Sequence, residues 1–509
     1  MSYLREWIIF MVLFKQRKKE MSLESNSKDE SKPKISVSEN LNTNYMYIYE
    51  EMNSTADLKR QKIKKTNFEM MLLYLETVID QNKLQERVME PLLQIEEEMN
   101  AQFVMCNISI NNSPIFNLMS AIEMMIDGSV LIFIEGNSSV YAVNIKSNTT
   151  RSITESTTEK TVKGAHDGFI ENLNTNISLI RQRVKTSDLT IKYFTLGNKS
   201  PSKVALLYIN NIVNPNVIQE IESRIELIST EFIIPSFHVE SIIQDAPLSP
   251  FPQILNTERP DRVAANLFEG RAVLLEENTS NVLIMPVSFF SFYQSPDDYS
   301  SRWLLGSFFR LIRLFSFFIA IMLPSLYIAI VGFHFEMLPD ELVLPIKKSI
   351  QGIPYPPILE ALIMELTLEL IREAGIRLPT TIGQTIGVVG GLVIGDAVVK
   401  AGLISNTMII VVALTAIASF VVPSSEMSNS VRLLRFAFMI SATILGLPGI
   451  VFAFMILTIH LCKLESFGQP YLFPIAPLNL KGLKDTFIRK PLWNKNVDIM
   501  RAKKKINIK

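Results

Sequence analysis

Cysteine is scarce in this chain, whose 509 residues include only Cys106 and Cys462. One pair of cysteines is too few for the disulfide framework that stabilises small secreted domains. The cysteine content therefore does not indicate passage through an oxidising compartment.

An excess of charge of either sign is also absent. Lys and Arg together number 50, Asp and Glu together number 50, and the formal net charge is zero. A nucleic-acid-binding protein usually carries a basic field over one face. We therefore expect no nucleic acid partner.

The local signatures of common catalytic sites are missing. The sequence contains no GxxxxGK[ST], HExxH or GxSxG motif and no paired CxxC, so nucleotide, zinc and acyl-transfer chemistry lack their usual residues. We expect no enzymatic activity, no catalytic or metal-ligating residues and no cofactor.

No signal peptide is expected at the N-terminus. Its apolar patch, residues 7–14, is too short to span a bilayer and is followed by Lys15, Arg17, Lys18 and Lys19. Residues 21–44 are rich in Ser, Lys, Asn and Glu without apolar periodicity. Residues 1–44 are predicted to be a disordered leader, whose first part is either an unstructured start or a weak interfacial anchor.

A soluble region of two subdomains is predicted next. Residues 45–112 are predicted to be a helical first subdomain, because apolar residues recur at helical spacing between 68 and 99. Residues 113–300 are predicted to be a second, mixed α/β subdomain. Its expected strands are 130–135, 139–145, 203–209, 271–276 and 282–287, and its expected helices are 168–185, 216–229 and 261–268.

Most of the hydrophobic excess lies after Trp303, and residues 301–465 are predicted to be a bundle of transmembrane helices. Residues 314–333 form an apolar run of the length that crosses a hydrocarbon core. Arg302, Arg310 and Arg313 precede this run, so the positive-inside rule places the soluble region in the cytoplasm. The further expected spans are 382–404, 408–422 and 432–461, the last with a kink or break at residues 446–449.

The tail, residues 466–509, is basic and is also expected in the cytoplasm. The predicted fold class is thus a multi-pass α-helical membrane protein, in contact with lipid, with an N-terminal cytoplasmic soluble domain of α+β (mixed α/β) type.

Glycine recurs at every fourth residue of the second span, at Gly383, Gly387, Gly391 and Gly395. A stripe of this kind allows close helix packing within lipid, where hydrophobic burial drives association only weakly. Asp396 and Lys400 follow at a spacing of four and share a helix face. They are either an interfacial pair or a functional pair inside the membrane.

Residues 354–378 form a helical pattern that is too acidic to face lipid. Glu365 and Glu369 lie one turn apart. They belong either to an amphipathic surface helix or to a helix that lines a water-filled pore, where acidic rings in an oligomer attract cations.

An even number of crossings follows when both ends are cytoplasmic. Four is the simplest number, but it places Arg432 and Arg435 outside. This conflict disappears if residues 354–378 also cross, or if the two arginines are buried among helices. We therefore predict four to six crossings.

Four segments together resemble one known family. They are the run Arg377-Leu-Pro-Thr-Thr-Ile-Gly-Gln-Thr-Ile-Gly-Val-Val-Gly-Gly-Leu-Val-Ile-Gly-Asp396, the preceding Glu369-Leu-Ile-Arg-Glu-Ala374, the C-terminal Ser466-Phe-Gly-Gln-Pro-Tyr-Leu-Phe-Pro474, and the soluble segment that starts at Gly164-Ala-His-Asp-Gly-Phe-Ile-Glu. They look like the A subunit of the bacterial spore germinant receptors, the GerA family. The resemblance covers residues 68–493, with Ala165 and Ser156 in place of the usual prolines of two loops.

The resemblance implies a function that no single residue shows. Such A subunits lie in the spore inner membrane with a transporter-like B subunit and a lipoprotein C subunit. Together these subunits sense nutrients and start germination. The A subunit is expected to form a homo-oligomer that acts as a nutrient-gated cation channel.

Two other classes of function remain open at this stage. A solute transporter would show inverted repeats with broken helices in matching positions, whereas this sequence has one candidate break. A scaffold would recruit partners through its soluble domain and use the membrane part only as an anchor.

Overall fold

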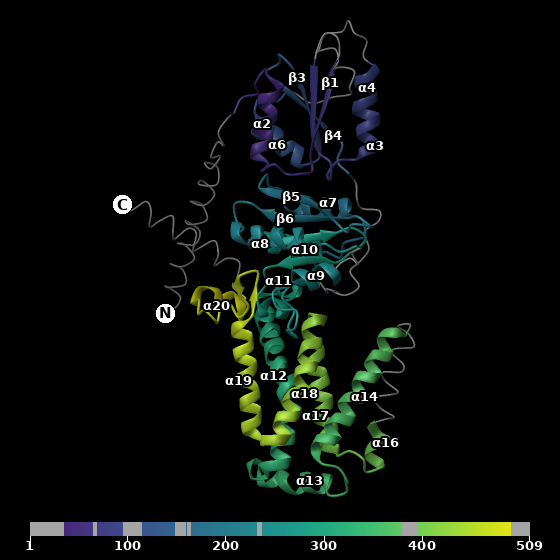
Figure 1. Ribbon diagram of the computed structural model, residues 1–509, viewed down its shortest axis with the longest axis vertical. Coiled ribbons are helices and arrows are strands. Elements are labelled where there is room, and N and C mark those ends of the chain that lie inside the picture. The colour runs from purple at the N-terminus through teal and green to yellow at the C-terminus, as the bar shows by residue number, and fades with distance from the viewer. Residues whose placement is uncertain are drawn as a thin grey trace, which may run out of the picture. The chain divides into compact units, whose positions relative to one another are not determined.

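The structure is a computed structural model that describes residues 35–64, 69–94, 114–147, 159, 164–231, 237–378 and 395–489 (Figure 1). The chain divides into two compact units. The first comprises residues 1–148 with 185–190, and the second comprises residues 149–184 and 191–509. Each unit is described separately.

The first unit is a four-stranded antiparallel sheet covered on both faces by helices (Figure 1). The strands, in the spatial order β1-β2-β3-β4, are β1 (Leu58–Lys64), β2 (Glu69–Leu75), β3 (Ser129–Ile134) and β4 (Val140–Asn144). The helices are α2 (Leu41–Glu51), α3 (Gln81–Leu84), η1 (Gln85–Met89), α4 (Glu90–Gln94) and α6 (Leu118–Ile126).

Strand β2 shows why both faces are covered. Met71 and Leu73 join the core under α2 and α6, whereas Met70 and Leu72 join the core under α3 and α4. Successive side chains of a strand point to opposite faces, so a continuous apolar run fills two cores.

The prediction of a helical first subdomain ending at residue 112 is wrong. Residues 69–75 are strand β2, because a short apolar run fits helical spacing and a doubly buried strand equally well. Strands β3 and β4 were assigned to the second subdomain. In the structure β3 pairs with β2 and β4 pairs with β3, so both belong to this first unit.

The prediction that the leader extends to residue 44 is also wrong at its end. Asn40 caps α2 by accepting hydrogen bonds from the backbone N–H groups of Asn42 and Thr43, and Val37 and Leu41 are buried. Residues 1–34 lie outside the described residues.

The second unit begins with an α+β subdomain. Its sheet has the order β5-β6-β8-β9-β7. The strands are β5 (Leu189–Leu196), β6 (Ser202–Ile209), β7 (Leu255–Thr257), β8 (Ala272–Glu276) and β9 (Val282–Met285). The helices are α7 (Leu173–Arg183), α8 (Pro215–Glu226), α9 (Phe237–Ile243), α10 (Pro260–Phe268), η3 (Phe289–Tyr293) and α11 (Pro296–Ser300).

All the strands and helices expected between residues 164 and 300 are confirmed within a few residues. The additional elements are β5, β7, α9, η3 and α11. Three residues are too few for periodicity to reveal a strand such as β7.

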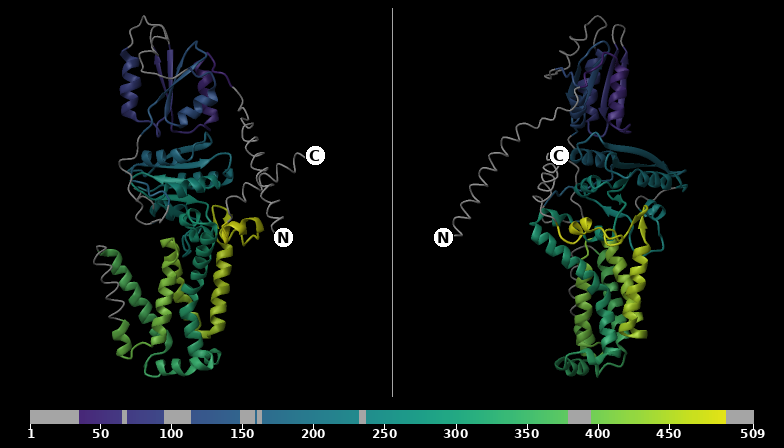
Figure 2. Two further views of the ribbon diagram at one scale, coloured as in Figure 1. Left: turned by 180° about the vertical axis from the view of Figure 1, so that it is seen from behind. Right: turned by 90° about the vertical axis from the view of Figure 1, so that its left-hand side faces the viewer.

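The same unit continues into a long helical part (Figure 2). Its elements are α12 (Trp303–Phe333), η4 (Phe335–Met337), α13 (Asp340–Ile350), α14 (Pro357–Arg377), α16 (Gly395–Lys400), α17 (Asn406–Phe420), α18 (Ser425–Leu445) and α19 (Leu447–Lys463). Helix α12 packs against α17, α18 and α19, and α14 packs against α12, α17 and α18. We call α12, α14, α17, α18 and α19 the helical bundle.

Within the described part of the chain, α12 alone is long and apolar enough to cross a membrane, with 31 residues and a mean hydropathy of 2.4. Helices α17 and α19 are apolar but shorter. The predicted spans 314–333 and 408–422 fall on α12 and α17, whereas residues 382–394 of the second predicted span lie outside the described residues.

The prediction of a single span over residues 432–461 is wrong, although the predicted break within it is confirmed. The chain reverses at Gly446 and forms the two neighbouring helices α18 and α19 (Figure 1). Gly446 has φ +64° and ψ −138°, a conformation that only glycine adopts readily. A side chain at Gly449 would collide with the carbonyl of Ser441, so the two backbones are in close contact.

The described part of the predicted tail is folded. It contains β10 (Glu465–Ser466), β11 (Gln469–Pro470) and α20 (Leu480–Thr486). The Tyr471 hydroxyl donates to the Pro252 carbonyl at 2.6 Å, and Ser466 Oγ donates to the Gln253 carbonyl at 2.8 Å. The segment after α19 therefore packs on the α+β subdomain that precedes α12.

Candidate functional site

Two carboxylates of α14 are buried in the interior of the helical bundle. Glu360 is fully buried and Glu365 is 1% exposed. The large apolar side chains of the same helix are exposed instead, namely Leu359, Ile363, Leu366, Leu370 and Ile376. The part of α14 that carries Glu360 and Glu365 therefore has the reverse of the polarity expected for an amphipathic helix on the protein surface.

Glu365 forms a buried ion pair with Arg435 of α18. The two side chains are 1% and 2% exposed. Arg435 Nε also donates to the Ala320 carbonyl of α12 at 2.8 Å. This pair thus joins α12, α14 and α18 at one level of the bundle.

Glu369 forms a second ion pair one turn further along α14. Arg432 Nη1 donates to Glu369 Oε2 at 2.9 Å, and the side chains are 13% and 34% exposed. Glu365 and Glu369 are four residues apart on α14, and Arg432 and Arg435 are three residues apart on α18. Each spacing is about one helical turn, so the two ion pairs lie one above the other between the helices. We call these four residues the Glu–Arg ladder.

Energetics distinguish the two steps of the Glu–Arg ladder. Removing one partner of a buried pair leaves an uncompensated charge and costs about 3–5 kcal/mol. A solvent-exposed pair contributes about 0.2–1 kcal/mol, and the pair of Glu369 with Arg432, 34% and 13% exposed, lies between these two cases. Glu365 with Arg435 is therefore the structural step, and Glu369 with Arg432 is the step that can open at lower cost.

Glu360 fixes the other end of α14. Its Oε2 accepts the backbone N–H of Ser405 at 3.1 Å. Ser405 Oγ lies 3.2 Å from the Tyr327 hydroxyl and accepts the N–H of Met408, which caps α17. The sequence placed Glu360 on the helix but did not indicate this role, since its partner lies 45 positions away.

The two arginines of the Glu–Arg ladder were expected to conflict with four crossings unless they were buried among helices or residues 354–378 also crossed. Arg435 is buried, whereas the side chain of Arg432 is 13% exposed, so burial among helices holds for Arg435 alone.

Comparison with known proteins decides the family. Residues 46–499 match the sequence model described as Bacillus/Clostridium GerA spore germination protein. The chain belongs to the GerA family. The resemblance expected from the sequence is confirmed.

Individual relatives of this GerA-family chain are similar over most of their length. It is 40% identical to "Spore germination protein A1" of Bacillus subtilis (strain 168), over 89% of this chain and 94% of that protein. It is 40% identical to "Uncharacterized membrane protein YfkQ" of the same organism, over 83% of each chain. It is 38% identical to "Spore germination protein GerQA" of Bacillus cereus, over 87% of this chain and 89% of that protein.

One solved structure is also similar. It is the N-terminal domain of the A subunit of the Bacillus megaterium spore germinant receptor GerK3, 26% identical with a TM-score of 0.40. The match covers 51% of this chain and 99% of that one.

The glycine stripe of this GerA-family chain stays a prediction. Gly383, Gly387 and Gly391 lie outside the described residues, and Gly395 begins α16. Lys400 ends α16 and is exposed, but the side chain of Asp396 is not described. Their predicted pairing is therefore also untested.

A second buried charge cluster joins the helical bundle to the α+β subdomain. Asp298 of α11 is 1% exposed and pairs with Arg313 at 2.6 Å and Arg310 at 3.4 Å, both from α12. Arg489 donates to the carbonyls of Asp298 at 2.8 Å and Ser301 at 2.6 Å. We call these residues the Asp298 cluster.

The Asp298 cluster was predicted only in part. Arg310 and Arg313 were expected as a positive flank of the first span, but not their acidic partner. The signal for Asp298 is the sequence Ser295-Pro-Asp-Asp298, which forms a capping box at the start of α11. Tyr471, in the segment after α19, is also buried, which raises the pKa of its hydroxyl well above the ordinary value.

Proposed function

We propose that this chain is the A subunit of a nutrient germinant receptor, located in the inner membrane of the spore. It acts with a B subunit and a lipoprotein C subunit, forms a homo-oligomer and contributes to a nutrient-gated cation channel, without enzymatic activity. The observation that carries this proposal is the reversed polarity of the helical bundle in a member of the GerA family.

The reversed polarity extends beyond α14. Buried polar side chains lie inside the bundle, including Ser316, Ser325, Thr415, Ser419 and Ser428. Large apolar side chains lie on its outside, including Phe315, Ile410, Ile417, Ile440 and Ile456. Polar groups turn inward and apolar groups outward when a bundle is surrounded by lipid.

Six crossings account for the chain path. The α+β subdomain before α12 contacts the segment after α19, so both lie on one side and the number of crossings is even. Helices α12, α14, α17, α18 and α19 extend between that side and the side of α13 (Figure 1). These give five crossings, and the span predicted from the sequence at residues 382–404 supplies the sixth that an even number requires. The positive-inside rule assigns the shared side to the cytoplasm.

The Glu–Arg ladder supports a role in cation passage. Both carboxylates of the proposed acidic face are neutralised by arginines in this conformation. Conduction along this face requires Glu369 to separate from Arg432, which is the less costly step. Nutrient binding in the receptor would then favour the separated state.

Cation release from spores tests the conduction proposal. Glu369→Gln should lower nutrient-triggered potassium release per receptor, normalised by immunoblot, and Glu369→Lys should lower it further, because fixed negative charge concentrates cations. The matched control is Glu373→Gln, one turn further along α14, whose carboxylate is 61% exposed and pairs with Arg377. Unchanged release in both Glu369 variants would remove the pore assignment, leaving a transporter or a scaffold.

Deletion of the gene followed by a germination screen tests the receptor role itself. Spores without the chain should lose the response to at least one nutrient, and the parent gene should restore it. An unaltered response to every nutrient in the screen would contradict the receptor role.

A further inference from the structure

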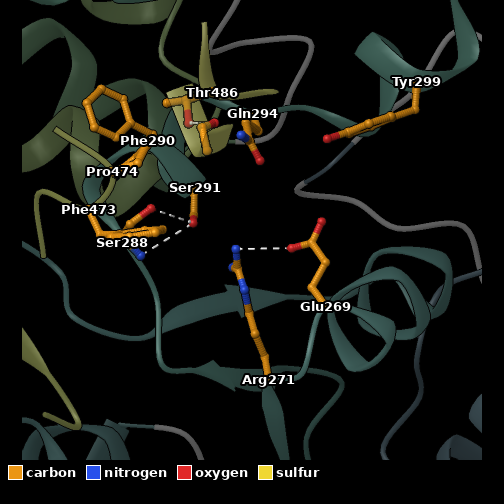
Figure 3. A pocket seen from close by; sticks show the side chains of 11 residues that line it. Glu269, Arg271, Ser288, Phe290, Ser291, Gln294, Tyr299, Phe473, Pro474 and Thr486 are labelled. Atoms are coloured by element: carbon orange, nitrogen blue, oxygen red, sulfur yellow. Dashed lines mark hydrogen bonds and ion pairs between the residues drawn. The ribbon is translucent and has the colours of Figure 1, made fainter. Parts of the chain in front are cut away.

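A cavity of about 160 Å³ lies beside the Asp298 cluster (Figure 3). Its walls come from three places in the chain. The turn between α10 and β8 contributes Glu269 and Arg271, the segment from Ser288 to Tyr299 contributes a second wall, and the segment after α19 contributes Phe473 and Thr486.

Arg271 supplies the positive charge of this cavity. Its side chain is directed into the space between the walls, next to Glu269 (Figure 3). The Arg271 side chain is only 19% exposed, and Glu269 Oε2 lies 3.2 Å from its Nη2, with a side chain that is 53% exposed. Among the described residues, Glu269 is the one carboxylate within ion-pair distance of Arg271.

The charge of Arg271 is poorly compensated. Burial lowers the pKa of Arg271, and the positive charge of nearby Arg262 lowers it further, while Glu269 opposes the shift. Arg262 itself donates to Glu159 and to the carbonyls of Ser291 and Gln294. A buried arginine whose acidic neighbour is half in solvent has donors left for an incoming anion.

The remaining walls define the shape of such an anion. Phe290, Phe473 and Pro474 form an apolar side, and Ser288 and Ser291 lie next to them (Figure 3). The arginine fork matches a carboxylate in two parallel hydrogen bonds. Because water occupies about 30 Å³ in the liquid, a cavity of this size suits a ligand of roughly five to eight heavy atoms.

We propose that this cavity binds a small monocarboxylate with a short apolar group, with Arg271 holding the carboxylate and the Phe290 and Phe473 rings contacting the apolar part. The site does not depend on the receptor role, because it is built from residues of this chain alone.

The cavity lies between the α+β subdomain and the segment after α19, so a bound carboxylate contacts both. One wall belongs to the α+β subdomain and another to the segment after α19. That segment is joined to the start of α12 by Arg489, whose backbone N–H donates to Ser307 Oγ at 3.1 Å. A ligand that contacts both walls stabilises the conformation in which the segment after α19 is packed on the α+β subdomain. Because Arg489 joins this segment to α12, the ligand also favours the matching conformation of the helical bundle.

Ligand binding to the purified full-length chain in detergent tests the site. The probe is radiolabelled isobutyrate in equilibrium dialysis, and isobutyramide, of the same shape without the charge, is the competitor that should fail. Arg271→Gln should weaken isobutyrate binding about tenfold or more, as expected for loss of a charged hydrogen-bonding partner. Lys199→Gln, which removes an exposed positive charge paired with Glu231, is the matched control and should bind as the parent does.

Glu269→Gln provides an independent arm that does not depend on the folding of an arginine variant. It removes the carboxylate that competes for Arg271, so it should bind isobutyrate more tightly than the parent. The proposal is overturned if the parent does not bind isobutyrate, if isobutyramide competes equally, or if Glu269→Gln binds more weakly.

Discussion

Replacement of Glu365 by Gln should strongly destabilise the helical bundle. The substitution keeps the shape of the side chain but leaves the buried charge of Arg435 without its counter-charge. Both side chains are at most 2% exposed, so solvent does not screen the loss. The expected decrease in the free energy of unfolding is about 3–5 kcal/mol, the usual cost of breaking a buried pair on one side.

A double-mutant cycle separates the pair from its surroundings. Arg435→Gln should cost at least as much as Glu365→Gln, because it also removes the hydrogen bond to the Ala320 carbonyl. The double variant should be more stable than the sum of the single effects predicts, since it leaves no unpaired charge. The measurement is denaturant unfolding of the purified chain in mixed micelles, supported by protein levels in the membrane.

The control for this cycle lies on the same helix. Glu373→Gln breaks the exposed pair with Arg377, whose side chains are 61% and 76% exposed, and should have little effect on unfolding. The reasoning is refuted if Glu365→Gln and Glu373→Gln unfold alike, or if the single effects of the cycle simply add.

Three further predictions concern other parts of the chain. Gly446→Ala should destabilise the α18–α19 reversal by about 1–3 kcal/mol, because an alanine Cβ would strain the backbone at φ +64° and meet Phe333, whereas Gly375→Ala at an open position should be tolerated in the same unfolding assay. Gly387→Leu should reduce assembly of the receptor on native gels if the glycine stripe packs against a neighbouring helix, and normal assembly with normal germination would show that the stripe is incidental. Burial, with the nearby carboxylates of Glu426 and Glu276, raises the pKa of Glu240 to about 8. A raised carboxyl pKa stabilises the folded state below the ordinary value of about 4.3, and this contribution is lost as the pH rises through 8. The parent should therefore lose stability between pH 6 and 8.5 by up to about 1.4 kcal/mol per pH unit more than Glu240→Gln does, and equal pH profiles would contradict the assignment.

Sequence patterns predicted the parts of this fold that depend on local periodicity. The strands and helices of the α+β subdomain were found because their apolar residues alternate or recur at helical spacing. The break at Gly446 was found because Gly and Pro occur together there. Strand β2 was misassigned, since its continuous apolar run satisfies two periods at once.

The sequence singled out the individual charged residues of the candidate site, but not which of them pair with each other. The sequence drew attention to Glu365 and Glu369 because acidic residues are costly in an apolar region, and to Arg432 and Arg435 because they conflicted with a simple topology. Their pairing joins positions about 65 apart and depends on how α14 packs against α18. No local pattern contains that information. The signal that could have suggested the pairing is that acidic residues on one predicted membrane helix and arginines on another are both costly in lipid unless they neutralise each other.

The folding of the segment after α19 was missed for a similar reason. Its basic composition indicated a cytoplasmic tail, but the contacts of Tyr471 and Ser466 are made to residues more than 200 positions earlier. Because these contacts place the two ends of the helical bundle on the same side of the membrane, they require an even number of crossings, on which the proposed topology rests.

Cysteine accessibility measures that topology most directly. In a background with Cys106 and Cys462 replaced by serine, single cysteines are placed at Asn172, at the exposed start of α7, and at Gln351, at the exposed end of α13. A membrane-impermeant maleimide applied to intact protoplasts should label Gln351→Cys, whereas Asn172→Cys should be labelled only after permeabilisation. Labelling of both positions from the same side would contradict a bundle that spans the membrane between them.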